Sequence, residues 1–89
     1  GVEQQTQSSS NLKVYPNPIV DILSIDLTGL ENKTGCVISI LSIDGKVLQE
    51  QKINNAEIVK FNLSHLSQGI YLCRYANATG IKTIKIIKQ

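Results

Sequence analysis

The chain has very little aromatic side-chain volume. Among its 89 residues there are one Phe, three Tyr, and no Trp or Met, although 42% of the residues are hydrophobic. The apolar content is therefore mostly Ile, Leu and Val, and a bias toward β-branched residues favours strands over helices. A chain of this length forms one domain and buries only about 60–65% of its unfolded surface, so we expect a thin core.

Charge and long apolar runs are also scarce, and their absence excludes several classes of partner. Nine Lys and Arg residues face seven Asp and Glu residues, which leaves a net charge of +2. That charge is too small to indicate nucleic acid or an anionic membrane surface as a partner. No apolar run reaches the roughly 18 residues of a transmembrane helix. The first residues carry no export signal, which indicates that one has been removed or that the chain is part of a longer protein.

No group of residues predicts catalysis or metal binding. Ser64 and His65 are adjacent, and aspartates occur at Asp21, Asp26 and Asp44. Adjacent residues on an extended strand point apart, whereas a catalytic triad needs its serine and histidine in contact. One histidine and two distant cysteines do not provide the clustered ligands of a metal site. We therefore expect no enzyme activity, no cofactor and no metal.

The pattern along the chain predicts an all-β, immunoglobulin-like antiparallel β-sandwich of about seven strands. Residues 1–11 are polar and rich in Gln and Ser, so we expect a flexible linker or tail there and a folded domain over 12–89. Apolar residues then alternate with polar ones at a period of two. Asp44-Gly45 predicts a two-residue hairpin, and the Gln-rich strand after it predicts a sheet edge. The expected strands are 12–14, 23–27, 36–40, 47–53, 59–63, 71–75 and 81–88.

Cys36 and Cys73 both fall on inward-facing positions of this alternation. Tyr71 stands two residues before Cys73 and follows Gly69, which is the spacing of the tyrosine corner in immunoglobulin domains, whose hydroxyl binds upstream backbone. The second cysteine of those domains forms a disulfide, but Cys36 lies on the third expected strand and not on the second. Two readings are open: a disulfide, or two buried free thiols that act as small apolar groups. The register favours the free thiols.

Lysines recur along the last expected strand, at Lys82, Lys85 and Lys88. Lysines on an edge strand discourage pairing between sheets of different molecules, so edge protection is the reading that the sequence favours. A recognition surface is the alternative. A terminal strand can also pair through its edge with a partner's sheet or with a second copy of the chain.

Four short blocks give the chain a family resemblance. In order, they resemble the C-terminal sorting domain of the bacterial type IX secretion system, of the type A found in Bacteroidetes. Two polar positions depart from the family pattern, because Ser42 and Asn62 stand where the family often has Asp. The blocks are Tyr15-Pro16-Asn17-Pro18 with Asp21, Leu23 and Ile25; Ile38-Ser39-Ile40 with Gly45-Lys46-Val47; Leu63-Ser64 with Leu66, Gly69, Ile70 and Tyr71; and Lys85-Ile86-Ile87-Lys88.

The resemblance implies a non-catalytic sorting signal for a secreted or cell-surface protein. Such a domain follows an upstream cargo that enters the periplasm, and it docks on the outer-membrane translocon. A sortase-like peptidase then commonly removes it, and residues 1–11 would contain the cut because proteolysis favours exposed flexible chain. The candidate recognition residues are Tyr15, Pro16, Asn17, Pro18, Gly69, Tyr71, Lys82, Lys85 and Lys88.

Two other functions fit the same pattern. One is a stand-alone secreted or periplasmic immunoglobulin-like binding module, and the other is a spacer or carbohydrate-binding domain attached to an enzyme. Sugar binding requires exposed aromatic side chains, and the few aromatics here are expected in the core. The full-length gene separates the remaining readings, because a long upstream domain supports sorting and an export signal directly before residue 1 supports the stand-alone module.

Overall fold

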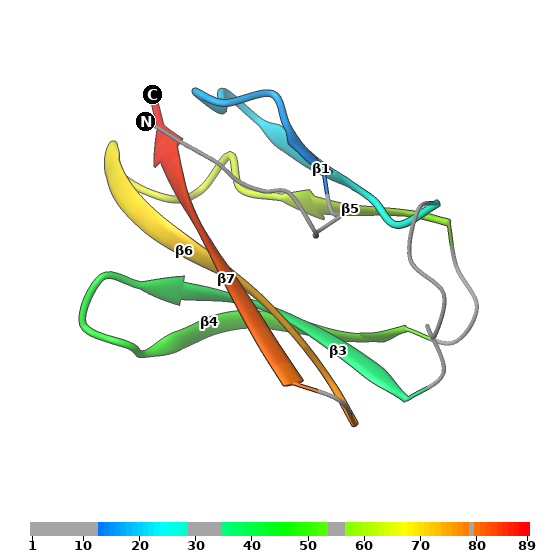
Figure 1. Cartoon of the computed structure of the whole chain (residues 1–89). Helices are drawn as coiled ribbons and strands as arrows, with labels where there is room; N and C mark the ends of the chain where they lie inside the picture. Colours follow the sequence, from blue (N-terminus) through cyan, green and yellow to red (C-terminus); the bar gives the residue numbers. More distant parts are fainter. Residues whose placement is uncertain (1–12, 29–34, 54–56, 79) are drawn as a thin grey trace.

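The computed structural model describes residues 13–28, 35–53, 57–78 and 80–89, and these residues form strands and no helix (Figure 1). The predicted tail at 1–11, the loop at 29–34 and the turn at Asn54-Asn55 lie outside the described residues. The seven strands are β1 (Lys13–Tyr15), β2 (Ile22–Asp26), β3 (Cys36–Ser42), β4 (Val47–Ile53), β5 (Ile58–Asn62), β6 (Gly69–Asn77) and β7 (Gly80–Lys88).

The strands form two antiparallel sheets, which confirms the predicted sandwich. One sheet has the order β1-β2-β5, and the other has the order β4-β3-β6-β7. In the immunoglobulin constant-type arrangement, the first, second, fourth and fifth strands share a sheet and the third, sixth and seventh share the other. Here β4 instead pairs with β3, so it is an edge of the larger sheet, as its Gln-rich sequence predicts. The two sheets lie face to face in Figure 1.

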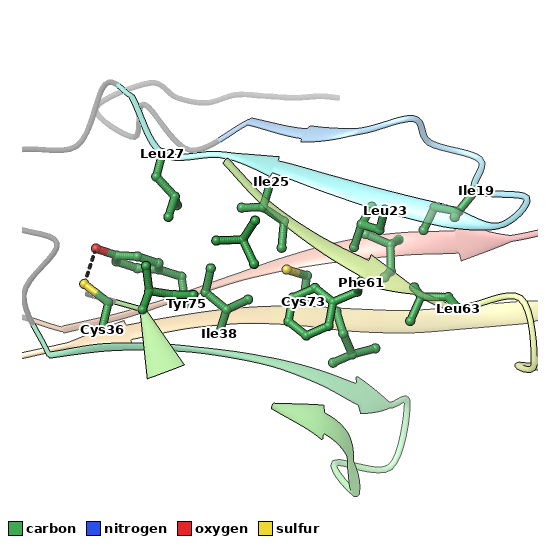
Figure 2. Close-up of a cluster of buried hydrophobic side chains, with 14 residues drawn as sticks. Ile19, Leu23, Ile25, Leu27, Cys36, Ile38, Phe61, Leu63, Cys73 and Tyr75 are labelled. Atoms are coloured by element: carbon green, nitrogen blue, oxygen red, sulfur yellow. Dashed lines mark hydrogen bonds between the residues drawn. The ribbon is translucent and has the colours of Figure 1, made fainter. Parts of the chain in front are cut away.

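The core lies between the sheets and is built by the period of two. In β2, Leu23 and Ile25 are fully buried while their neighbours are partly or largely exposed. Phe61 of β5 is the largest fully buried side chain, and it lies among aliphatic side chains from both sheets (Figure 2). Burial of an aliphatic or phenyl side chain stabilises the fold by about 1.5–3 kcal/mol. The core cluster is Ile19, Leu23, Ile25, Leu27, Cys36, Ile38, Ile40, Ile53, Val59, Phe61, Leu63, Cys73, Tyr75 and Ile86.

The hairpin between β3 and β4 differs in its loop from the sequence prediction. The Ser42 amide donates to the Lys46 carbonyl at 2.8 Å, and the Gly45 amide donates to the Ser42 carbonyl at 2.9 Å. Three residues, Ile43, Asp44 and Gly45, therefore form the loop instead of Asp44 and Gly45 alone. Gly45 has a φ of 95°. It is therefore the residue in the left-handed conformation that completes a three-residue hairpin loop.

The two departures from the family pattern preserve the local hydrogen bonds that an aspartate would make. The Lys46 amide donates to the Ser42 hydroxyl at 3.1 Å. The Ser64 amide and hydroxyl donate to Asn62 Oδ1 at 3.0 and 2.7 Å. In both turns a side-chain oxygen, of Ser42 or of Asn62, accepts a hydrogen bond from a backbone amide further along the chain. An aspartate carboxylate makes the same kind of bond in such turns.

The two cysteines are buried and form no disulfide, as the register predicts. Cys73 pairs across the sheet with Ile40, four residues along β3 from Cys36. That offset corresponds to about 13 Å along the strand, whereas a disulfide needs Cα atoms within about 7 Å. Burial raises the pKa of the Cys73 thiol to about 12. Cys36 Sγ instead contacts the Tyr75 hydroxyl at 2.9 Å (Figure 2). The pKa of Tyr75 is raised, mainly by its burial and to a smaller extent by this contact.

Candidate functional site at the C-terminal corner

The proline corner connects β1 to β2 and lies against the end of β7. The Tyr15–Pro16 and Asn17–Pro18 peptide bonds are both cis, and all four residues of the corner are largely exposed. The chain then enters the core at Ile19, which has no exposed surface. Proline has no amide hydrogen and a fixed φ, so the corner cannot continue β1 as a ladder strand. Its side chains and carbonyls are left to make other contacts.

Asn17 makes those contacts with the backbone of β7. Its Oδ1 accepts a hydrogen bond from the Ile87 amide at 3.0 Å, and its Nδ2 donates to the Lys85 carbonyl at 3.4 Å. A carboxamide presents one donor and one acceptor, as a peptide group does. The Asn17 side chain thus takes the place that a neighbouring strand would occupy beside the edge of β7.

Ile19 continues this contact with its own backbone. Its amide donates to the Ile87 carbonyl at 2.7 Å, and its carbonyl accepts from the Gln89 amide at 2.8 Å. The pairing is a short parallel bridge between Ile19 and Lys88, which joins the segment before β2 to the opposite sheet. The Ile19 side chain lies at the same end of the core cluster as Leu23 and Leu63 (Figure 2). We call Asn17 and Ile19, with the backbone of residues 85–89 that they bind, the edge latch.

The third sequence block, around Gly69 and Tyr71, lies on the other side of β7. Gly69 and Tyr71, at the start of β6, pair with Lys88 and Ile86. The Tyr71 hydroxyl donates to the Ser67 carbonyl at 2.7 Å, which confirms the predicted bond to upstream backbone. Gly69 has a φ of 150°, a conformation that other residues rarely adopt. The proline corner, the Gly69–Tyr71 corner and the last residues of β7 are therefore brought to one end of the molecule.

The three lysines of β7 do not share one environment. Lys85 is exposed on the outer face of the larger sheet, whereas Lys88 is only 7% exposed and its Nζ donates to the Gln89 carbonyl at 2.7 Å. Lys82 lies opposite Tyr75, six residues from Lys88. Six residues of strand span about 20 Å, so Lys82 lies outside the corner. All three belong to an edge strand, in agreement with the edge-protection reading.

Sequence reasoning missed several residues of this corner. Ile19 was not singled out, although it fastens the proline corner to β7. Ile70 and Ile87 pair across the outer face and are 46% and 41% exposed. The signal for them is present in the runs Gly69-Ile70-Tyr71-Leu72 and Ile84-Lys85-Ile86-Ile87, where apolar residues fall on both phases of the strand. Such strands have apolar groups on the outer face as well as in the core.

The described residues contain no group of three or more His, Cys, Asp or Glu side chains that could hold a metal ion. The Ser64 hydroxyl donates to Asn62, while the exposed His65 has its Nε2 3.5 Å from Gln49 Nε2. Ser64 and His65 therefore do not form a catalytic pair. Within the same described residues, no helix is long and apolar enough to cross a membrane.

Fold and corner together define a small immunoglobulin-like sandwich whose C-terminal strand is fastened at the proline corner. The family model described as the secretion system C-terminal sorting domain matches residues 13–89, which include every residue that the structure describes. The chain belongs to this family, the C-terminal sorting domains of the type IX secretion system. No curated protein matches it.

Membership in this family defines the general function of the chain. It is a type IX secretion C-terminal sorting signal, and a protein that carries it is secreted or located at the cell surface. Its partners are the secretion machinery and an upstream cargo. Domains of this family are sorting signals and not catalysts.

Proposed function

We propose that this domain directs an attached cargo from the periplasm through the outer-membrane type IX translocon to the cell surface. The observation that carries the proposal is that the family match covers the fold from β1 to Gln89. A signal that is read as a folded domain requires its recognition residues to be held together, and three sequence blocks meet at one end of the sandwich. A short linear signal would not require a buried core of this kind.

We further propose that the translocon binds this end of the domain. The surface consists of Tyr15, Pro16, Asn17 and Pro18 beside Gly69, Tyr71, Lys85 and Lys88, with Lys82 further along β7. Most of these residues are exposed, and the edge latch holds the proline corner beside the final strand. The outer-face Ile70 and Ile87 border the same surface and add apolar area to it.

The domain boundary and the cut are part of the same proposal. A folded unit over 12–89 follows a flexible segment over 1–11, and a sortase-like peptidase cuts within that segment. Its composition supports this, because a polar Gln- and Ser-rich stretch is readily bound in an extended form by a peptidase. The mass of the cargo recovered from the cell surface identifies the cut, and a cut inside the sandwich would contradict the assignment.

The direct test is export of a reporter. Residues 12–89 are fused to a periplasmic reporter in a bacterium with a working type IX system, and we expect the reporter at the cell surface. A reporter that stays in the periplasm with the intact domain would show that the sorting proposal is wrong. Deletion of residues 82–89 should also block export, but it removes the buried Ile86 and so does not separate recognition from folding.

A charge reversal on the surface separates an effect on recognition from an effect on folding. Lys85 is exposed on an edge strand of the larger sheet, and Lys60 is exposed on an edge strand of the smaller one. We expect Lys85→Glu to reduce export and Lys60→Glu to leave it unchanged, because only Lys85 belongs to the proposed surface. Thermal melts of both variants verify the fold. Equal export of the two variants would remove Lys85 from the recognition surface.

A further inference from the structure

The direction of the backbone groups along β7 follows from the edge latch. The Ile87 amide and carbonyl and the Lys85 carbonyl bind Asn17 and Ile19, so they point away from β6. In an antiparallel strand, residues alternate between pointing their backbone groups to the neighbouring strand and away from it. The backbone groups of Thr83 and Ile81 therefore also point outward, as does the Lys85 amide. The latch stops at Lys85, and no described residue pairs with β7 between Ile81 and Ile84 on this side.

The other edges of the sandwich are covered, broken or short. At the β5 edge, Gln49 and Gln51 extend across from β4, and their Nε2 atoms donate to the Asn62 and Lys60 carbonyls at 2.9 and 3.0 Å. The pairing of β4 with β3 shifts register between Ile40 and Leu41. Strand β1 contains only Lys13–Tyr15. Among the described strands, β7 thus has a regular edge on which another strand can pair, over the part that the latch leaves uncovered.

The charge of β7 indicates which strand can pair there. Between Gly80 and Lys88 there are three lysines and no acidic residue. Pairing of two copies of β7 would place the lysines of both copies along one seam without a carboxylate to neutralise them, and like charges across strands are destabilising. An extended segment with carboxylate side chains would instead gain a favourable cross-strand pair at each lysine. The edge therefore disfavours a dimer of this chain and favours an acidic partner.

We propose that residues 81–85 of β7 bind an extended, acidic segment of a partner protein as an additional strand. The segment adds to the sheet in line with Ile19, which already occupies the last part of the same edge. Lys82 and Lys85 lie on opposite faces of the sheet, so carboxylates three residues apart in the segment lie beside them. Aliphatic side chains lie beside Ile81, which is 66% exposed, and the half-buried Ile84. Main-chain hydrogen bonds supply affinity in such additions and the side chains supply specificity. This assignment rests on the proposed function, because it identifies the partner with a component of the secretion machinery.

Peptide binding to the whole chain tests the proposal without any export step. The probes are two acetylated peptides, a Val/Glu peptide with the repeat Val-Glu-Val, whose successive Glu side chains point to opposite faces, and a Val/Lys peptide with Lys in place of Glu. We expect the Val/Glu peptide to bind roughly tenfold more tightly, a difference of about 1.4 kcal/mol, and to slow amide hydrogen exchange at Ile81 and Thr83. Equal affinities, or protection at another strand, would overturn the proposal. Self-association of the chain with protection at the same two amides would also overturn it, in favour of a dimer.

Three variants complete the test. Thr83→Pro removes the outward amide but no bond to β6, so it should abolish peptide binding and reduce export, while Thr83→Val retains the amide and should preserve both. Export of the Thr83→Pro protein at the normal level would overturn the inference and leave the sorting function intact, whereas failure of the unmodified domain to export would refute the function itself. If Thr83→Pro does not fold, the double variant Lys82→Glu/Lys85→Glu keeps the test decisive. It should reverse the preference toward the Val/Lys peptide, and an unchanged preference would overturn the proposal.

Discussion

Replacing Asn17 with alanine removes the side chain that fastens the proline corner to the last strand. Two hydrogen bonds are lost, one from the Ile87 amide at 3.0 Å and one to the Lys85 carbonyl at 3.4 Å. The backbone bonds of Ile19 to Ile87 and Gln89 remain, at 2.7 and 2.8 Å. The variant therefore weakens the edge latch without opening the core.

The expected loss of stability is about 1 kcal/mol. A hydrogen bond contributes about 0.5–1.5 kcal/mol net, and the 3.4 Å contact belongs at the weak end of that range. Both groups lie at an exposed edge, so water replaces Asn17 and no buried group is left unpaired. For a domain of this size, 1 kcal/mol lowers the melting temperature by about 4–8 °C. The free energy of unfolding should change by no more than this.

Calorimetry measures the loss of global stability in Asn17→Ala, and amide hydrogen exchange measures the weakening of the edge latch. Exchange at the Ile87 amide should accelerate in Asn17→Ala, while exchange at amides directed to β6 should follow only the global change in stability. Gln68→Ala is the matched control, because Gln68 is an exposed amide in the turn before β6 and its loss should change stability by less than about 0.5 kcal/mol. An unchanged melting temperature together with unchanged exchange at Ile87 would refute the role assigned to Asn17.

Two further predictions concern the buried side of the sandwich. Tyr71→Phe loses the 2.7 Å hydrogen bond to the Ser67 carbonyl and should lower the free energy of unfolding by about 1 kcal/mol in urea titrations, and an unchanged midpoint would contradict this. The Cys73 thiol has a pKa of about 12 in the folded chain against an ordinary value of 9.0, so its stabilising contribution is complete below about pH 9 and is lost as the pH rises toward 12. Stability should fall in that window by up to about 1.4 kcal/mol per pH unit for this one proton, and the slope should be shallower in Cys73→Ala; identical slopes would refute the assignment.

The strands could be predicted from the sequence because their alternation is strict. Leu23 and Ile25, and likewise Val59 and Phe61, follow a period of two, and each is buried as the pattern requires. The bond of the Tyr71 hydroxyl was predictable for a related reason, since it joins residues only four apart. The absence of a disulfide between the cysteines followed from counting strands.

The parts that could not be predicted depend on contacts between distant segments or on the local path of a turn. Asn17 binds a backbone group 70 residues away, and nothing in a one-dimensional pattern indicates that a side-chain amide will take the place of a strand. Lys88 belongs to the inward phase of β7 yet is a charged residue, and it is buried opposite Gly69 with its ammonium bound to the Gln89 carbonyl. The hairpin loop has three residues because the closing hydrogen bond joins Ser42 to Lys46 and Gly45 takes the left-handed conformation at the third loop position.

The separation of the two buried thiols bears on how the domain responds to oxidising conditions. Cys36 and Cys73 lie on neighbouring strands of one sheet, four rungs apart, and neither side chain is exposed. The fold therefore needs no oxidant to form and offers no accessible thiolate to a disulfide-exchange catalyst. Once folded, a domain with both thiols buried does not form mixed disulfides with other proteins, because neither sulfur can be reached.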